Sequence, residues 1–395
     1  GTCLMVGGDG ADALTLGTTF ANAIPSRIVA ANLPANLLTA IKATGAEIIE
    51  VGCGGQCGGL DTLVEANTNG AGFDDIIVCG KVNNDCLEKL ATKLSHGGLF
   101  NIVCNKPTER EISVDVGRIH YDDWYYIGTS GTDISAAYGS HRTRTELKAG
   151  GTAWLLGAGG PMGQMHVQRA CEMPNGPKLI VATDIDPARL QELRERFIPA
   201  AEAHDRTLIV LNPQDFTPEA FNAKLRELDG GRGFDDVVAL VPVPVLIKQA
   251  AEHTAQDGQL NIFAGVVRGT QCSLALSDIY LKNVRWVGSS GSKISDMRET
   301  LRMAESGELL TANAVAAIGG LSAVYEGLEL VMAQAVPGKI VIYQQIPEMP
   351  IIRLSELKDV LPTVAAKLRD GKYWTREAED ELLRLKLHLP ETVEA

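Results

Sequence analysis

A glycine-rich stretch near the middle of the 395-residue chain has the spacing of a turn that binds phosphate groups. It follows an apolar run at 152–157, ends on Ala158-x-Gly160-x-x-Gly163, and leads into a helical pattern at 164–170. Such a turn needs glycine where the chain bends sharply, where the main chain approaches a pyrophosphate, and where helix and strand pack closely. Amide groups at the start of the helix then hold the phosphates. Ala158 departs from the glycine that usually opens the pattern. The residues predicted to contact the pyrophosphate are Gly159, Gly160, Pro161, Met162 and Gly163.

A carboxylate follows the next predicted strand. The apolar run 178–183 ends on Asp184, 21 residues beyond Gly163, and Ile185 comes directly after it. A carboxylate in this place accepts hydrogen bonds from the adenosine ribose hydroxyls and repels a 2′-phosphate. Strand, turn, helix, strand and acid together form a dinucleotide-binding βαβ unit. We therefore expect Asp184 and Ile185 to bind the adenosine end of NAD, in preference to NADP.

The same order of elements occurs twice in the chain. Gly1-Thr2 corresponds to Gly151-Thr152, and Gly8-x-Gly10-x-x-Ala13 corresponds to the glycine stretch 150 residues later. The segment 72–78 likewise matches 233–239. Strands that alternate with helices at crossover spacing build a parallel sheet. The fold class predicted is α/β, with two tandem doubly wound (Rossmann) domains and a C-terminal helical tail.

The predicted domain limits follow from this repeat. They are 1–145 for the first Rossmann-like repeat, 146–345 for the second, NAD-binding repeat, and 346–395 for the helical extension. In the first repeat we expect strands at 2–7, 27–31, 47–51, 74–79, 99–104 and 124–129. In the second we expect them at 152–157, 178–183, 207–211, 236–241, 259–264 and 284–289. Helices are expected at 294–306, 321–333, 355–369 and 375–386, and a strand at 338–343.

The two repeats differ where a ligand would bind. The first has Asn32 at the acidic position, and Asp9 and Asp12 in its turn oppose an anionic phosphate. We interpret it as a degenerate copy of the cofactor site, with dinucleotide binding there as the alternative. The last strands, 124–129 and 284–289, pair either within one chain or between chains, and both arrangements hide exposed sheet edges.

Composition limits the partners and the compartment. The formal net charge is −13, which disfavours nucleic acid and anionic membranes, and 45% of the residues are hydrophobic. We expect a cytoplasmic protein whose scattered cysteines are reduced core residues. Cys53 and Cys57 lack the second Cys or His pair of a closed zinc site, so we expect two free thiols there and assign no metal ligand.

With these motifs the chain resembles the zinc-type medium-chain dehydrogenases, most of all the sorbitol dehydrogenase and sorbose-1-phosphate reductase group. The resemblance rests on 151–163, 233–242, 260–265, 287–291 and 338–342. It implies that two loops lie beside the nicotinamide of the cofactor, and these contain Val241, Pro242, Ala264 and Gly265. It also implies a catalytic zinc in a barrel-like domain that precedes the cofactor domain.

No segment of this sequence matches that zinc domain, and none of the seven histidines stands in a ligand-like pattern. Either the polypeptide continues upstream with it, as we expect, or this chain binds a dinucleotide without turnover of its own; catalytic residues remain unassigned. The predicted function is NAD-dependent hydride transfer to and from a secondary alcohol of a polyol or sugar derivative, in a homo-oligomer. The alternative is a non-catalytic dinucleotide-binding or scaffolding subunit.

Overall fold

The computed structural model describes residues 1–17, 24–52, 58–139, 144–333, 335–336 and 338–389. The chain forms two compact units. The first comprises Gly1–Gly157, Pro174–Ile185 and Asp205–Gly291, and the second comprises Ala158–Met173, Asp186–His204 and Ser292–Ala395. The domain limits expected at 145 and 345 describe the sequence repeat and stay a prediction.

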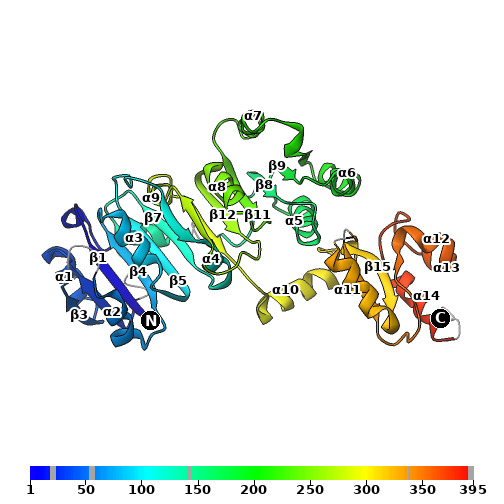
Figure 1. Cartoon of the computed structure of the whole chain (residues 1–395), viewed down its shortest axis with the longest axis horizontal. Coiled ribbons are helices and arrows are strands. Elements are labelled where there is room, and N and C mark those ends of the chain that lie inside the picture. Colours follow the sequence, from blue (N-terminus) through cyan, green and yellow to red (C-terminus); the bar gives the residue numbers. More distant parts are fainter. Residues whose placement is uncertain (18–23, 53–57, 140–143, 334, 337, 390–395) are drawn as a thin grey trace. The chain divides into compact units, whose positions relative to one another are not determined.

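The first unit is built around one twelve-stranded sheet, in the order β10-β9-β8-β11-β12-β14-β7-β5-β4-β1-β2-β3 (Figure 1). The strands of the first repeat are β1 (Thr2–Gly7), β2 (Arg27–Ala31), β3 (Glu47–Val51), β4 (Phe73–Cys79), β5 (Leu94–Val103) and β7 (Tyr125–Thr129). Those of the second are β8 (Thr152–Leu156), β9 (Leu179–Thr183), β10 (Thr207–Leu211), β11 (Phe234–Ala239), β12 (Thr254–Ile262) and β14 (Arg285–Gly288).

Each half of the sheet has the strand order of a doubly wound fold. Numbered within its own repeat, each half runs 3-2-1-4-5-6, and all neighbours within a half are parallel. The predicted α/β class and the positions of all twelve strands are confirmed. The largest discrepancies are at β5 and β12, which begin at 94 and 254 where 99 and 259 were expected, because the polar and glycine residues that precede each apolar run already belong to the strand.

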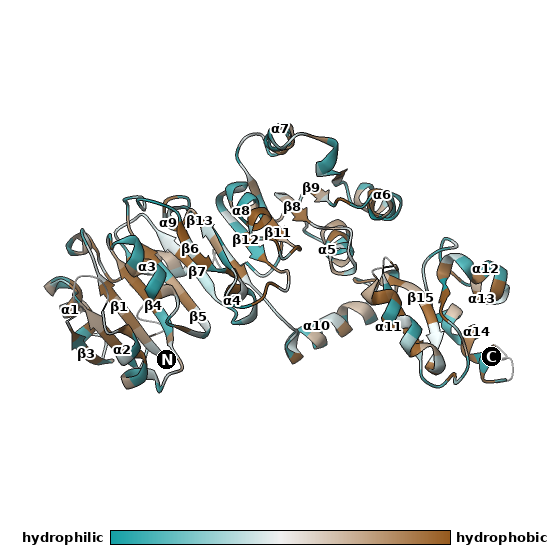
Figure 2. Cartoon of the chain, in the orientation of Figure 1, coloured by the Kyte–Doolittle hydropathy of each residue, from teal (hydrophilic) through white to brown (hydrophobic). Residues whose placement is uncertain are grey.

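Both faces of the sheet are covered in the first repeat. Alternate residues of β1 belong to different core clusters: Leu4 and Val6 to one, Cys3 and Met5 to the other. Because successive side chains of a strand point to opposite faces, β1 is buried on both sides. This explains why it reads as a continuous apolar run, and Figure 2 shows the same hydrophobic character along the central strands.

The two halves join within one chain. β14 pairs with β7 in antiparallel orientation, with Trp286 opposite Tyr126, and the two rings are fully or almost fully buried with centroids 6.0 Å apart. A second antiparallel pair, β6 (Ile112–Asp115) with β13 (Gln271–Leu274), also links the repeats. The structure thus confirms pairing within the chain. Neither half leaves its sixth strand as an exposed edge.

Helices connect these strands. The first repeat has η1 (Ala11–Ala13), α1 (Ala35–Lys42), α2 (Leu60–Thr68), α3 (Asn84–Ala91), α4 (Val116–Tyr121) and η3 (Ile134–Tyr138). The second has α5 (Pro161–Glu172), α6 (Pro187–Glu202), η5 (Pro213–Asp215), α7 (Pro218–Leu228), α8 (Pro244–Glu252) and α9 (Ser277–Leu281), of which α5 and α6 belong to the second unit.

The second unit adds a small mixed sheet to α5 and α6. Its strands are β15 (Val315–Gly320), β16 (Lys339–Tyr343) and β17 (Ile352–Arg353), with β16 parallel and β17 antiparallel to β15. Its other helices are α10 (Ile294–Glu305), η6 (Thr311–Ala314), η7 (Leu321–Ala323), α11 (Val324–Met332), η8 (Leu354–Glu356), α12 (Leu357–Val360), α13 (Pro362–Ala365) and α14 (Arg376–Lys386).

One expected helix is wrong. The segment 355–369 was expected to be continuous, yet it breaks into η8, α12 and α13. The break falls at Leu361, whose φ of −136° and ψ of 68° lie outside the helical region. Pro362 follows, and a proline disfavours helical geometry in the residue before it. The periodic apolar positions still face one core, which contains Leu357 and Val364.

Candidate cofactor-binding site

The turn after β8 begins with a left-handed residue. Gly157 has φ +82°, and its N–H donates to the carbonyl of Thr183 at 2.9 Å. A Cβ on Gly157 would lie 2.4 Å from Cγ1 of Val241. Only glycine meets both conditions without strain. Gly157 was given no role by the sequence, but it makes the sharp bend that was expected one residue later, at Ala158.

The next two glycines meet the other two requirements of the turn. Gly160 is the N-cap of α5, and among the described atoms none lies within 4 Å of where its Cβ would be, so the main chain there is open. Gly163 is the reverse, because a Cβ on it would lie 2.5 Å from the carbonyl carbon and oxygen of Ala158. Close packing therefore requires glycine at 163, and open main chain leaves room for a ligand at 160.

Helix α5 supplies amide donors at its start. Pro161 occupies the first helical position, where a missing N–H costs nothing, and its fixed φ favours the helix. The N–H groups of Met162 and Gly163 follow, in the first turn, where the helix itself offers no acceptor. Gln164 makes the first regular bond, from its N–H to the carbonyl of Gly160 at 2.9 Å. Such an end favours an anion.

Asp184 follows β9, the strand that pairs in parallel with β8. Its N–H donates to the carbonyl of Leu211 at 3.3 Å, and its side chain is partly buried. The cap of α6 is a different carboxylate, Asp186, which accepts from the N–H groups of Ala188 and Arg189 at 2.9 and 3.0 Å. Ile185 between them is 60% exposed. Asp184 therefore does not serve as the cap of α6.

The remaining predicted residues follow β11 and β12. Val241 is partly buried and Pro242 exposed, while Ala264 is buried and its N–H donates to the carbonyl of Ala239 at 2.9 Å. Gly265 is exposed. Because β9, β8, β11 and β12 are consecutive parallel neighbours, the predicted positions of the first unit follow the carboxyl ends of strands at one edge of the sheet. Residues 184, 185, 241, 242, 264 and 265 belong to the first unit, and 159–163 to the second.

The first repeat holds the loop after β12. A Cβ on Gly265 would lie 3.2 Å from the hydroxyl of Tyr121, the last residue of α4. Arg268 donates to Asp122 at 2.8 Å and lies over the Tyr121 ring, and the N–H of Gly269 donates to Asp115 at 2.9 Å. Sequence reasoning missed Tyr121, since only the pairing of the two halves brings α4 to this loop.

The corresponding turn of the first repeat is closed by protein. The N–H of Asp9 donates to the carbonyl of Lys81 and the N–H of Lys81 to that of Asp9, both at 2.8 Å. Lys106 forms an ion pair with the Asp9 carboxylate at 2.6 Å, which lowers the pKa of Asp9. A Cβ on Gly8 would lie 2.3 Å from the Lys81 carbonyl oxygen. A three-residue 3-10 helix, η1, takes the place of a long α-helix.

Cysteine and histidine give no metal centre in the described ranges. There, no three His, Cys, Asp or Glu side chains gather closely enough to hold an ion, so we derive no step that uses zinc. Cys53 and Cys57 lie outside the described residues. Cys3, Cys79, Cys104 and Cys272 are buried free thiols, and Cys171 is buried as well. Cys86 is disulfide-bonded, so the expectation that the cysteines are reduced is wrong at this position. In those same ranges, no helix combines the length and apolar composition needed to cross a membrane.

Fold and turn together define a doubly wound α/β protein of the Rossmann type. The sequence model of the family described as "Zinc-binding dehydrogenase" matches residues 161–306. A mannitol-1-phosphate 5-dehydrogenase from Aliivibrio fischeri is 30% identical over 296 residues, which cover 69% of either chain. The chain belongs to the zinc-type medium-chain dehydrogenases.

Two further proteins are similar to this chain. An L-sorbose 1-phosphate reductase from Klebsiella pneumoniae is 32% identical over 260 residues, or 65% of this chain and 60% of the reductase. Among solved structures, an alcohol dehydrogenase from Thermotoga maritima is 21% identical over 53% of each chain, with a TM-score of 0.42. The alignments therefore span between about half and 69% of the length of these relatives.

Proposed function

We propose that this chain provides the cofactor-binding part of an NAD-dependent oxidoreductase that interconverts a secondary alcohol and a ketone in a polyol or sugar derivative. The observation that carries the proposal is the division of roles among Gly157, Gly160 and Gly163: sharp bend, open main chain and close packing. Dinucleotide binding requires these three roles at this point of a βαβ unit. The relatives named for mannitol 1-phosphate and L-sorbose 1-phosphate suggest a phosphorylated polyol or sugar.

The residues of this chain would bind and orient the cofactor. The amides of Gly160, Met162 and Gly163 hold the pyrophosphate, with Gly159 and Pro161 shaping the turn. Asp184 accepts the ribose hydroxyls, and Ile185 flanks the adenine. Val241, Pro242, Ala264 and Gly265 line the nicotinamide and exclude water from it. Bound NAD supplies a hydride acceptor, and the protein's contribution is orientation and exclusion of water.

The assembly that we propose differs from simple strand pairing between chains. Since β14 already pairs with β7, a homo-oligomer would have to use surfaces other than this edge. The first repeat would then stabilise the loop after β12, through the contacts of Tyr121 and Asp122 with that loop.

A titration with NADH, followed by nicotinamide fluorescence, tests the proposal. The chain should bind NADH, and Asp184→Asn should weaken NADH binding about 10-fold, as expected for the loss of a charged hydrogen-bond acceptor. The same substitution should improve NADPH binding because it removes a charge that repels the 2′-phosphate. Asp205→Asn is the matched control: Asp205 is exposed in the turn that precedes β10, at the opposite edge of the sheet. Failure of the unaltered chain to bind NADH would refute the proposal.

A further inference from the structure

Gln164 links the glycine turn to Arg196, a partly buried residue of α6. Gln164 is the fourth residue of α5, and its side chain is only 4% exposed. Its Nε2 donates to the carbonyl of Gly159 at 3.2 Å. Its Oε1 accepts from Nη1 of Arg196 at 2.8 Å. The side-chain amide of Gln164 is thus hydrogen-bonded to the glycine turn through its nitrogen and to α6 through its oxygen. All these residues belong to the second unit.

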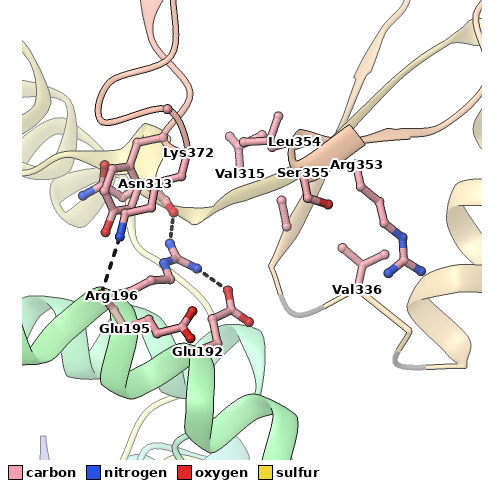
Figure 3. A pocket seen from close by; sticks show the side chains of 13 residues that line it. Glu192, Glu195, Arg196, Asn313, Val315, Val336, Arg353, Leu354, Ser355 and Lys372 are labelled. Carbon is pink, nitrogen blue, oxygen red and sulfur yellow. Dashed lines mark hydrogen bonds and ion pairs between the residues drawn. The ribbon is translucent and has the colours of Figure 1, made fainter. Parts of the chain in front are cut away.

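Arg196 is itself fixed from several sides. Its guanidinium forms an ion pair with Glu192 at 2.7 Å and donates to the carbonyl of Asn313. Asn313 is buried, and its side chain accepts from Arg369. Figure 3 shows the Arg196 guanidinium between Glu192 and Asn313, at the side of a cavity of about 350 Å³. Because the guanidinium is a rigid planar fork, these bonds determine where it meets Gln164.

The bond to Gly159 determines the direction of the next amide. In a trans peptide, the C=O of one residue and the N–H of the following one point in opposite directions. When Gln164 holds the Gly159 carbonyl, the N–H of Gly160 must point away from Gln164. Glycines on both sides of this peptide would let it rotate easily without such an anchor. No described atom fills the Cβ position of Gly160 within 4 Å.

We propose that Gln164, held by Arg196, is a positioning residue that fixes the peptide between Gly159 and Gly160 so that its N–H faces the cofactor pyrophosphate. The inference rests on the proposed function for its ligand, but the orientation of the peptide is a property of the protein alone. Gln164 does not touch the cofactor. It acts through the main chain of the turn.

The helix offers a matched control. Gln168 lies one turn further along α5, is also 4% exposed, and donates from Nε2 to Glu172 at 2.9 Å and to the carbonyl of Leu310 at 3.1 Å. Gln164→Met and Gln168→Met both keep the length of the side chain and remove a buried hydrogen-bonding amide. Both should lower stability to a similar extent. Only the first removes a bond to the glycine turn.

The first measurement needs no nucleotide. Backbone ¹⁵N relaxation of the Gly159 and Gly160 amides should give rigid order parameters, about 0.85, in the unaltered protein and in Gln168→Met. In Gln164→Met they should fall below about 0.6. Order parameters that are the same in Gln164→Met and in the unaltered protein, or that fall equally in both variants, would overturn the proposal.

The second measurement is the NADH dissociation constant. Gln164→Met should weaken binding about 5- to 20-fold, and Gln168→Met should leave it within twofold. Arg196→Met should weaken binding by a similar factor, and the double variant should add little, since the two side chains act as one unit. Additive effects of the two substitutions on NADH binding would show that Arg196 does not act through Gln164. If the unaltered chain binds no NADH, the proposed function fails, and the relaxation data alone decide whether Gln164 fixes the turn.

Discussion

The two halves of the twelve-stranded sheet have the same strand order but end their first strands differently. After β1, the main chain of Asp9 and Lys81 exchange two hydrogen bonds and close the turn. After β8, Gly160 opens a twelve-residue helix and its Cβ position is empty. The same strand order therefore does not by itself leave the turn after the first strand open. We propose that the few residues after the first strand decide whether a turn can bind a ligand.

A second difference lies at the start of the fourth strand. In both repeats the first aspartate of the pair serves the same purpose: Asp74 accepts from the N–H of Thr2 at 2.7 Å, and Asp235 from that of Thr152 at 2.9 Å. The second aspartates have diverged. Both carboxylate oxygens of Asp236 accept from Nη1 of Arg144 at 2.8 Å, whereas Asp75 accepts from the hydroxyl of Tyr138 at 2.6 Å.

The largest effect is expected from breaking the charged pair of the second repeat. Asp236 is 2% exposed and also accepts from the N–H of Lys148 at 2.7 Å. Asp236→Ala leaves the partly buried Arg144 without its partner, so the free energy of unfolding should fall by about 3–5 kcal/mol. Urea denaturation measures it. A loss under 1 kcal/mol would show that the pair is not what anchors the segment before β8.

The corresponding change in the first repeat should have the opposite sign. Burial raises the pKa of Asp75 to about 7, and the bond from Tyr138 offsets only part of that rise. An unfolded aspartate has a pKa of about 4, so between these pH values only the folded chain holds the proton. The stability contributed by Asp75 is therefore complete below about pH 4 and is lost as the pH rises towards 7.

Asp75→Asn stays neutral at every pH and should remove this loss. Relative to the unaltered chain, it should gain about 2–4 kcal/mol at pH 8 and almost nothing near pH 4. Denaturation curves across this range check the prediction. A variant that is less stable at pH 8 would mean that the ionised carboxylate is well accommodated.

The next prediction concerns reciprocal substitutions at equivalent positions of the two turns. Ala13 of the first repeat occupies the position of Gly163 in the second. Gly163→Ala should weaken NADH binding about 30-fold or more, because the new Cβ would lie 2.5 Å from the Ala158 main chain and must displace the turn. Ala13→Gly should leave NADH affinity unchanged. Equal NADH affinities of Gly163→Ala and Ala13→Gly would show that the turn after β8 does not form the NADH site.

The smallest effect concerns the exposed charges of the closed turn. Lys106→Met removes the partner of Asp9, but both side chains are largely exposed, and such pairs contribute little. The main-chain bonds between Asp9 and Lys81 should keep the turn closed, so thermal stability and NADH binding should hardly change. New NADH binding in this variant would show that the Lys106–Asp9 pair had kept the turn closed.

Much of the fold could be predicted from sequence because the repeat supplied two copies of each signal. Apolar runs located all twelve strands, and the glycines at 160 and 163 located the turn. The break at Leu361 was missed because the apolar periodicity continues across Pro362. Strand β15 was also missed, since its six residues have no clear alternation and include only two β-branched side chains, Val315 and Ile318.

The candidate site was predictable only where chain neighbours form it. Asp184 and the glycine turn could be predicted because their spacing along one βαβ unit is a local sequence pattern. Tyr121 and Gln164 are different, because their roles depend on partners from other elements, the loop after β12 and Arg196. Long-range contacts of this kind leave no local pattern in the sequence. The role of Gly157 could have been read from the extra glycine before Ala158.

We propose that one of the two repeats binds a dinucleotide and that the turn of the other is closed by protein. Isothermal titration of the chain with NADH tests it most directly, with Gly163→Ala and Ala13→Gly titrated in parallel. We predict one NADH per chain, weakened strongly by Gly163→Ala and unaffected by Ala13→Gly. Two equivalent sites per chain, or a single site that survives Gly163→Ala unchanged, would contradict the account.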